Sequence, residues 1–384
     1  MSAESFIPLA RPDLDDETIA EALRNIESIL RQGRLSMGPY LEELERSVAS
    51  SAGRTHGVGV SSGTAGLHLC LRALGIGAGD EVVTTPFSFI ATTNCLLFEN
   101  ITPVFADIDP DSYNLDPAAL EAAITPRTRA ILPVEVFGNP AHFDEYERIA
   151  RSHNLALIED CCEALGARLG DRPAGSFGDC GVFAFYPNKQ ITTGEGGLIV
   201  TDNEDLRDLC VSMRNQGRDT GAGWLAHARL GYNYRMPETS AAIGCAQMQR
   251  LEKILARRRE AAELYDEALA DIRGVHLPPM HDRRQASWFV YVIRLADEFT
   301  RQDRDKVMEH LRESGVSCSN YFAPIHLQPF VRTELGTREG QFPQTERIGD
   351  RTIALPFFAG LDERQVSRVR EALEKALPAV AGGA

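Results

Sequence analysis

Residues 56–201 alternate short β-type runs with segments of helical periodicity, and this alternation restricts the possible folds more than any other feature. The β-type runs are HGVGV (56–60), EVVTT (81–85), PVFAD (103–107), RAILPV (129–134), LALIED (155–160), CGVFAFY (180–186) and GGLIVT (196–201). They are apolar almost throughout, which is typical of strands that are covered on both faces. The sequence therefore predicts an α/β fold in which helices flank a mostly parallel sheet.

The pattern changes after residue 236. Residues 238–270 predict one long helix with apolar side chains on one face, which leads the chain away from the sheet. A strand at 288–295 and further helices then predict a smaller α+β unit. We expect a large cofactor-binding domain over residues 1–250, which includes the N-terminal segment, and a small C-terminal domain over residues 251–384.

The composition argues against several classes of function. Lys and Arg number 40 and Asp and Glu 55, so the formal net charge is −15, which argues against a surface that binds nucleic acid or anionic membranes. No run approaches the roughly 20 apolar residues that span a bilayer. The eight cysteines show no C-x-x-C spacing, so we expect free thiols, no metal site and a cytoplasmic protein.

Three motifs carry candidate chemistry, and the first is VSSGTAGLH (60–68), which runs from a predicted strand through a short loop into a helix. The free N–H groups at the start of that helix, together with the Thr64 hydroxyl, suit a phosphate group. A side-chain cap from Ser62 or Thr64 explains the same pattern. Both interpretations stay open at this point.

The second candidate is Asp160, at the carboxyl end of the strand LALIED. Ligands collect at this end of the strands in open α/β sheets. A buried carboxylate that stays ionised beside a cation is one interpretation. A cap on a following helix is the other, and the motif alone does not separate them.

The third candidate is Lys189, in FAFYPNKQITTGEGG (183–197), where aromatic residues precede the lysine and glycines follow it. Most turn lysines are solvated and carry no chemistry. A lysine in an apolar pocket loses proton affinity and can attack carbonyl groups. The glycines at 194–197 let the main chain pass close to a ligand.

Taken together, the three motifs match the binding groups of one cofactor. A helix start for a phosphate, a carboxylate for a ring cation and a lysine for a carbonyl suit pyridoxal 5′-phosphate (PLP). Phe89, in TTPFSFIATTN, can stack on the pyridine ring. The order of these features along an α/β chain predicts a PLP site.

The chain resembles the DegT/DnrJ/EryC1/StrS family, sugar aminotransferases of the fold-type I, aspartate aminotransferase-like group. The resemblance spans nearly the whole length and rests on the ordered motifs IPLARPDLDDETI, GRLSMGPYLEELE, SSGTAGLHLCLRALGIGAGDEVVTTPFSFIATTN, PVFADIDPDSYNLDP, IEDCCEALGA, FAFYPNKQITTGEGG, LGYNYRMPETSAAIGCAQMQRLE, YFAPIHLQPF and LPFFAGLDERQV. It implies a PLP-dependent transaminase. Such an enzyme moves an amino group from glutamate or glutamine to a keto group of a nucleotide-linked (deoxy)sugar.

The resemblance also implies roles for individual residues. Lys189 is expected to bond to the cofactor aldehyde, and Asp160 to pair with the protonated pyridine nitrogen; both are catalytic. The other expected cofactor-binding residues are Gly63, Thr64, Ala65, Phe89, Glu163 and Asn233. Asn233 is expected to reach the phosphate of the neighbouring subunit, which implies a homodimer with shared active sites. The residues expected on the sugar side are Tyr186, Arg235, Tyr321 and His326.

Two positions depart from the family pattern. Ala184 stands where many relatives carry a serine whose hydroxyl binds the phosphate. Glu163 stands where His or Gln is frequent, near the phenolic oxygen of the cofactor. Because two anionic oxygens repel each other, Glu163 must be protonated, bridged by water or turned away.

The cofactor motifs bear differently on three alternative functions of this fold. A ketocyclitol aminotransferase would carry the same cofactor motifs, so the sequence does not separate it from a nucleotide-sugar enzyme. A deoxysugar 3-dehydratase would replace Lys189 by histidine. A regulatory protein that retains the fold would have a broken cofactor set, whereas Lys189 and Asp160 are both present.

Overall fold

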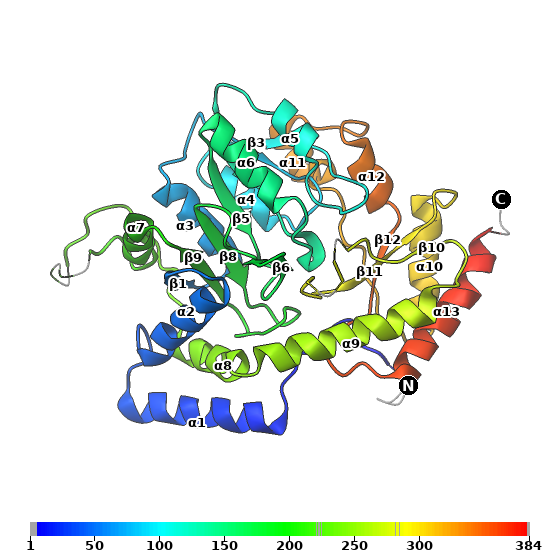
Figure 1. Ribbon diagram of the computed structural model, residues 1–384, viewed down its shortest axis with the longest axis horizontal. Coiled ribbons are helices and arrows are strands. Elements are labelled where there is room, and N and C mark those ends of the chain that lie inside the picture. The colour runs from blue at the N-terminus through cyan, green and yellow to red at the C-terminus, as the bar shows by residue number, and fades with distance from the viewer. Residues whose placement is uncertain are drawn as a thin grey trace.

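The computed structural model describes residues 6–219, 221, 223, 225–280, 282–283 and 285–381, and its elements gather around two main β-sheets (Figure 1). The larger sheet has the strand order β1–β9–β8–β5–β4–β2–β3. Its strands are β1 (His56–Val60), β2 (Glu81–Thr84), β3 (Thr102–Phe105), β4 (Thr128–Leu132), β5 (Ala156–Asp160), β8 (Cys180–Ala184) and β9 (Gly197–Thr201). Only β9 runs against its neighbours, so the predicted mostly parallel sheet is confirmed.

Helices cover both faces of this sheet. One face carries α3 (Gly63–Ala73), α4 (Ala91–Leu97) and α7 (Glu204–Arg214), and the other carries α2 (Pro39–Ser51), α5 (Pro117–Ala122) and α6 (Phe143–His153). Successive residues of a strand serve opposite faces, as Val82 packs in the core with α3 and Val83 in the core with α6. This burial on both sides explains why the strand sequences are apolar without alternation.

The helix predicted over 238–270 is two helices, which corrects the expectation from the sequence. The chain forms α8 (Glu238–Met248) and then α9 (Leu251–Leu269). Arg250 leaves the helical conformation, with φ −117° and ψ 12°, and its guanidinium lies 2.7 Å from Asp15, the N-cap of α1 (Asp16–Gln32). In Figure 1 the two helices run one after the other from the large sheet toward the small one.

The small sheet is antiparallel. It consists of β10 (Val275–His276), β11 (Tyr291–Leu295) and β12 (Thr352–Leu355) and packs with α9, α10 (Arg301–Glu313) and α13 (Glu363–Ala381). The remaining short elements are β6 (Arg168–Leu169), β7 (Arg172–Pro173), η2 (Val136–Gly138), η3 (Ile325–Leu327), α11 (Pro329–Leu335) and α12 (Pro343–Gly349).

The N-terminal segment packs with this C-terminal part. Ile7 is buried in the core of the small sheet and forms a bridge to Val316. The predicted division of the chain at residue 250 stays a prediction. Among the helices within the described ranges, none combines the length and the apolar character needed to cross a membrane.

Candidate active site

A cavity of about 610 Å³ opens where the parallel strands of the large sheet end. Residues that follow β1, β2, β5 and β8 form one side of it, and residues from the C-terminal part close the other. Eight of the residues predicted from the sequence line it, namely Gly63, Thr64, Phe89, Asp160, Glu163, Tyr186, Lys189 and Tyr321. Ala65, Asn233, Arg235 and His326 do not.

The start of α3 reconciles the two interpretations of the first motif. Ser62 caps the helix, since its Oγ accepts the N–H of Ala65 at 3.1 Å. The N–H groups of Gly63 and Thr64, in the first turn, have no partner within the helix. A side chain at Gly63 would place a Cβ 2.7 Å from the Cys162 sulfur, so only glycine lets α3 start this close to β5.

Asp160 is the last residue of β5 and is 4% exposed. The chain continues into turns instead of a helix, so the helix-cap interpretation is wrong. Oδ2 accepts a hydrogen bond from the Thr92 hydroxyl at 2.7 Å, and Oδ1 accepts the N–H of Cys162 at 3.3 Å. The carboxylate is thus held in one orientation at the cavity wall.

Thr92 was missed by sequence reasoning. It lies three residues after Phe89, in the first turn of α4, and its hydroxyl oxygen is 2.8 Å from that of Ser88. The available signal was the polar run ATTN directly after the aromatic residues, at a strand end where side chains converge.

Lys189 lies in the turn between β8 and β9, and its side chain is 13% exposed. Nζ lies 3.8 Å from Glu163 Oε1 and 3.9 Å from the centre of the Phe289 ring. The main-chain N–H donates to the Tyr186 carbonyl at 2.9 Å, and the carbonyl accepts from Arg258 at 2.9 Å. The interpretation of Lys189 as a solvated turn lysine therefore does not fit this largely buried side chain.

Glu163 faces Lys189, so it is not turned away. It is 4% exposed, and its Oε2 accepts the main-chain N–H of Phe137 at 2.8 Å. Burial raises the pKa of Glu163 to about 7, although the Lys189 charge and the Phe137 N–H act in the opposite direction. A carboxyl with this pKa changes its charge near neutral pH.

His326 was expected on the sugar side of the site, but it does not line the cavity. It is fully buried in η3, where Nε2 lies 2.9 Å from Glu346 Oε1 and the ring packs edge-on against Phe342. Tyr321, from the same motif, does line the cavity, and its hydroxyl accepts from the Asn188 amide at 3.4 Å.

Asn233 and Arg235 also lie away from the cavity of their own chain. Arg235 donates to the Asn215 side chain at 2.9 Å. Asn233 is exposed, and the tyrosines on either side of it stack on each other and against His68.

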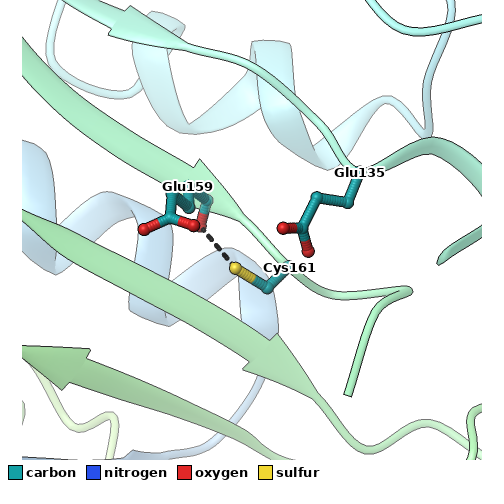
Figure 2. Close-up of side chains that lie close together, drawn as sticks. All are labelled: Glu135, Glu159 and Cys161. Carbon is teal, nitrogen blue, oxygen red and sulfur yellow. Dashed lines mark hydrogen bonds between the residues drawn. The ribbon is translucent and has the colours of Figure 1, made fainter. Parts of the chain in front are cut away.

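A separate buried cluster lies behind Asp160. Ligand-type atoms of Glu135, Glu159 and Cys161 lie within 4.8 Å of one another, and Figure 2 shows the three side chains with the hydrogen bond from the Cys161 thiol to the Glu159 carbonyl. The Glu159 carboxylate already accepts three main-chain N–H groups, and Arg54 lies 3.7 Å away. We therefore assign this carboxylate a structural role, and the absence of a metal stays a prediction.

With the site described, comparison with known proteins identifies its family. The family model "DegT/DnrJ/EryC1/StrS aminotransferase family" matches residues 16–374. The chain belongs to this family. It is 38% identical over 343 residues to a GDP-perosamine synthase of Caulobacter vibrioides, which covers 89% of this chain and 91% of that protein.

Two solved structures extend the comparison. DesI, determined in the presence of its TDP-sugar product, is 33% identical with a TM-score of 0.88, covering 98% of this chain and 94% of DesI. NtdA of Bacillus subtilis, with bound cofactor PMP, is 28% identical with a TM-score of 0.88, covering 97% of this chain and 86% of NtdA. The expected fold, cofactor and enzyme class, a PLP-dependent sugar aminotransferase, are confirmed.

Proposed function

We propose that this enzyme transfers an amino group from glutamate or glutamine to a keto group of a nucleotide-linked (deoxy)sugar. The observation that carries the proposal is the cavity itself, where Lys189 and Asp160 face polar side chains from the C-terminal part. The similarity to a GDP-perosamine synthase and to DesI supports a nucleotide-linked sugar as the substrate class.

The residues at the ends of the strands fit PLP. When bound, PLP supplies an electron-withdrawing ring that accepts the electron pair released from a broken C–H bond. Asp160, fixed by Thr92, would hold a proton on the ring nitrogen. The N–H groups of Gly63 and Thr64 would bind the phosphate, and Phe89, which is 64% exposed at the cavity, would cover one face of the ring.

Lys189 would carry the proton in the reaction. Within the described part of the chain it is the only basic side chain that lines the cavity. Its Nζ would take a proton from the donor amino acid and return it to a neighbouring atom, which needs an amine held in place close to both positions. The hydrogen bonds of its main-chain N–H and carbonyl groups hold the main chain of Lys189 in place beside the cavity.

Polar side chains from both walls of the cavity suit the hydroxyl groups of a sugar. Asn188 Oδ1 is buried and has no hydrogen-bond partner among the described residues, so it offers an acceptor beside Lys189. The Tyr321 hydroxyl lies next to the Asn188 amide, and Tyr186 is 53% exposed at the cavity. A bound hydroxyl group would satisfy the Asn188 oxygen.

We also propose a homodimer with shared sites, which the charges in the cavity and the exposure of Asn233 support. The cavity contains Asp160, Glu163 and Glu195 but only Lys189 as a cation among the described residues, so a phosphate dianion needs further donors. Asn233 is exposed and could serve a second copy of the chain. Exposed apolar side chains on α1 also favour association, and they are Ile19, Leu23 and Leu30.

The experiment is a two-stage reaction with purified protein. PLP-loaded enzyme is first treated with glutamate, glutamine or another amino acid, and the loss of its visible absorbance identifies the donor. The aminated enzyme is then offered keto sugars linked to GDP or TDP and a ketocyclitol. Return of the absorbance only with the ketocyclitol would favour that alternative, and a protein that stays colourless with PLP would refute the proposal. A cytoplasmic location, expected from the free thiols, belongs to the same proposal.

A further inference from the structure

The Lys189–Glu163 pair is the only close ion pair within the cavity for which the described residues supply both partners. Glu163 uses one oxygen to accept the Phe137 N–H and turns the other, Oε1, toward Lys189 Nζ at 3.8 Å. The amine has the Phe289 ring on another side, at 3.9 Å. No other acid is as close to the amine in the part of the chain that the structure describes.

The side chain of Gln190 connects the main-chain segments that carry Lys189 and Glu163. The Glu163 carbonyl accepts the side-chain amide of Gln190, the residue after Lys189, at 2.6 Å. Gln190 also donates to the Ser287 hydroxyl at 2.8 Å. The turn that carries Lys189 is therefore hydrogen-bonded directly to the turn that carries Glu163, and this bond holds the two turns at a fixed separation.

The charges around Glu163 make its ionisation depend on Lys189. The titratable groups that face it are Lys189, Asp160, Cys162 and Tyr321. Lys189 is the only cation of these four, and Asp160 repels a second negative charge. If the lysine nitrogen loses its positive charge, the buried carboxylate is left without a positively charged neighbour, which is costly unless it takes up a proton.

We propose that Glu163 is the proton acceptor of Lys189: its carboxylate takes the proton that the amine must release before it attacks a carbonyl group, and it then remains a neutral carboxylic acid. The inference rests on the role assigned to Lys189 in the proposed function. The proton moves from Nζ to Oε1, so ammonium and carboxylate become amine and carboxylic acid with no other atom or electron exchanged. Condensation of the amine with an aldehyde then releases one water.

The distance sets a condition on this transfer. At 3.8 Å the two atoms are too far apart for a direct hydrogen bond. One bridging water or a small rotation of the Lys189 side chain closes the gap, as is common before substrate binds. The burial of Glu163 supports the neutral product, because it raises the pKa of this carboxyl to about 7.

Infrared difference spectroscopy tests the protonation directly. Apoprotein and PLP-loaded protein are compared at about pH 8, where Glu163 is ionised before loading. We expect a carbonyl band of a protonated carboxyl to appear on loading in the wild type and in Glu195→Gln, which removes the other glutamate of the cavity, but not in Glu163→Gln. Bound PLP without this band would overturn the inference alone, whereas failure of PLP to bond to Lys189 would overturn the proposed function as well.

Kinetics provide a second measurement. Bond formation between Lys189 and PLP, followed by absorbance after rapid mixing at about pH 7, should be about a hundredfold slower in Glu163→Gln, at the lower end of the range expected for general-base catalysis. Glu195→Gln should slow the reaction less than Glu163→Gln does, because within the described residues Glu163 is the acid in ion-pair range of Lys189. A faster reaction in Glu163→Gln would show that Glu163 only holds the amine protonated, and it would overturn the inference.

Discussion

The two walls of the cavity are built differently. On the sheet side, Asp160 and the start of α3 follow directly from strands, and short hydrogen bonds fix each group in place. On the C-terminal side, Tyr321 reaches the cavity while His326, five residues later, is buried against Glu346. The groups of the sheet wall therefore follow directly from strand ends, whereas the other wall depends on loops.

This difference separates chemistry from specificity. Groups at strand ends move little because the sheet and its covering helices hold them, and this suits the fixed geometry that proton transfer requires. Loops tolerate substitution and are where binding selectivity commonly resides. We therefore expect substitutions on the sheet wall to affect the rate, and substitutions on the loop wall to affect the choice of substrate.

The largest effect is expected at Lys189. Lys189→Ala removes the only basic side chain that lines the cavity in the described part of the chain, so turnover should fall by several orders of magnitude. PLP should still bind through the Asp160 side of the cavity, but without the visible absorbance of a lysine-bound cofactor. Turnover and absorbance spectra check this, and borohydride reduction of the wild type should label Lys189. Label on another lysine, or near-normal turnover of the variant, would contradict the assignment.

Mixed dimers test whether the phosphate end of the sheet wall is completed by a second chain. Lys189→Ala and Asn233→Ala should each be nearly inactive alone. A verified heterodimer of the two contains one site with both residues intact, so it should recover about half of the wild-type activity. No recovery would show that Asn233 does not serve the neighbouring site.

The sheet wall could be predicted from the sequence because its signals are local. Long apolar strands and a helix start after β1 place Asp160 and Gly63 at one edge of the sheet once the order of the strands is known. Lys189 stood out because aromatic residues and glycines surround it. The single long helix was wrong because the chain breaks at Arg250, whose side chain pairs with Asp15, a residue far away in the sequence that the local helical pattern does not reveal.

The loop wall could not be predicted in the same way. Phe289 lies in an apolar run that indicates a strand, and nothing in that run shows that its ring contacts Lys189. His326 was expected beside the sugar by resemblance, yet its pairing with Glu346 turns it into the protein interior. Ala65 was expected at the phosphate, but the Ser62 cap uses its N–H. Contacts between residues distant in sequence decide all three cases.

An intermediate effect is expected at Thr64. Thr64→Val removes a hydroxyl at the cavity while keeping the size of the side chain, and Ala184 offers no hydroxyl to replace it. The PLP dissociation constant should rise more than tenfold, on the order of 1.5 kcal/mol, as for a charge-assisted hydrogen bond. Fluorescence titration of apoprotein measures it. Thr64→Ser is the matched control and should bind nearly as the wild type does, whereas unchanged binding by Thr64→Val would place the phosphate elsewhere.

His326 and Tyr321 give a paired test of the loop wall. Tyr321→Phe removes a hydroxyl from the cavity and should raise KM for the sugar severalfold, about 1 kcal/mol. His326→Ala should leave KM nearly unchanged but lower stability by roughly 1–3 kcal/mol, because it removes a fully buried side chain and its hydrogen bond to Glu346. Urea unfolding and steady-state kinetics on both variants check this. A rise in KM for His326→Ala with unchanged stability would instead indicate that His326 contributes to binding of the sugar.

Through Glu163, the stability of the sheet wall should also depend on pH. Glu163 has a pKa of about 7 in the folded protein because it is buried, whereas an exposed glutamate has a pKa of about 4.3. Between these values the folded protein keeps a proton that the unfolded chain has released. The free energy of unfolding therefore falls as pH rises through this window, by up to about 1.4 kcal/mol per pH unit for this group. Glu159, also buried with a pKa of about 7, adds a slope of the same sign.

Urea unfolding of apoprotein between about pH 5 and pH 7, at one protein concentration, tests this dependence on pH. The decrease of the free energy of unfolding with pH should be shallower in Glu163→Gln than in the wild type by up to about 1.4 kcal/mol per pH unit, while Glu195→Gln keeps the slope of the wild type. Equal slopes in the wild type and Glu163→Gln would mean that Glu163 is ionised throughout this range, and the sheet wall would then carry its negative charge even without the cofactor.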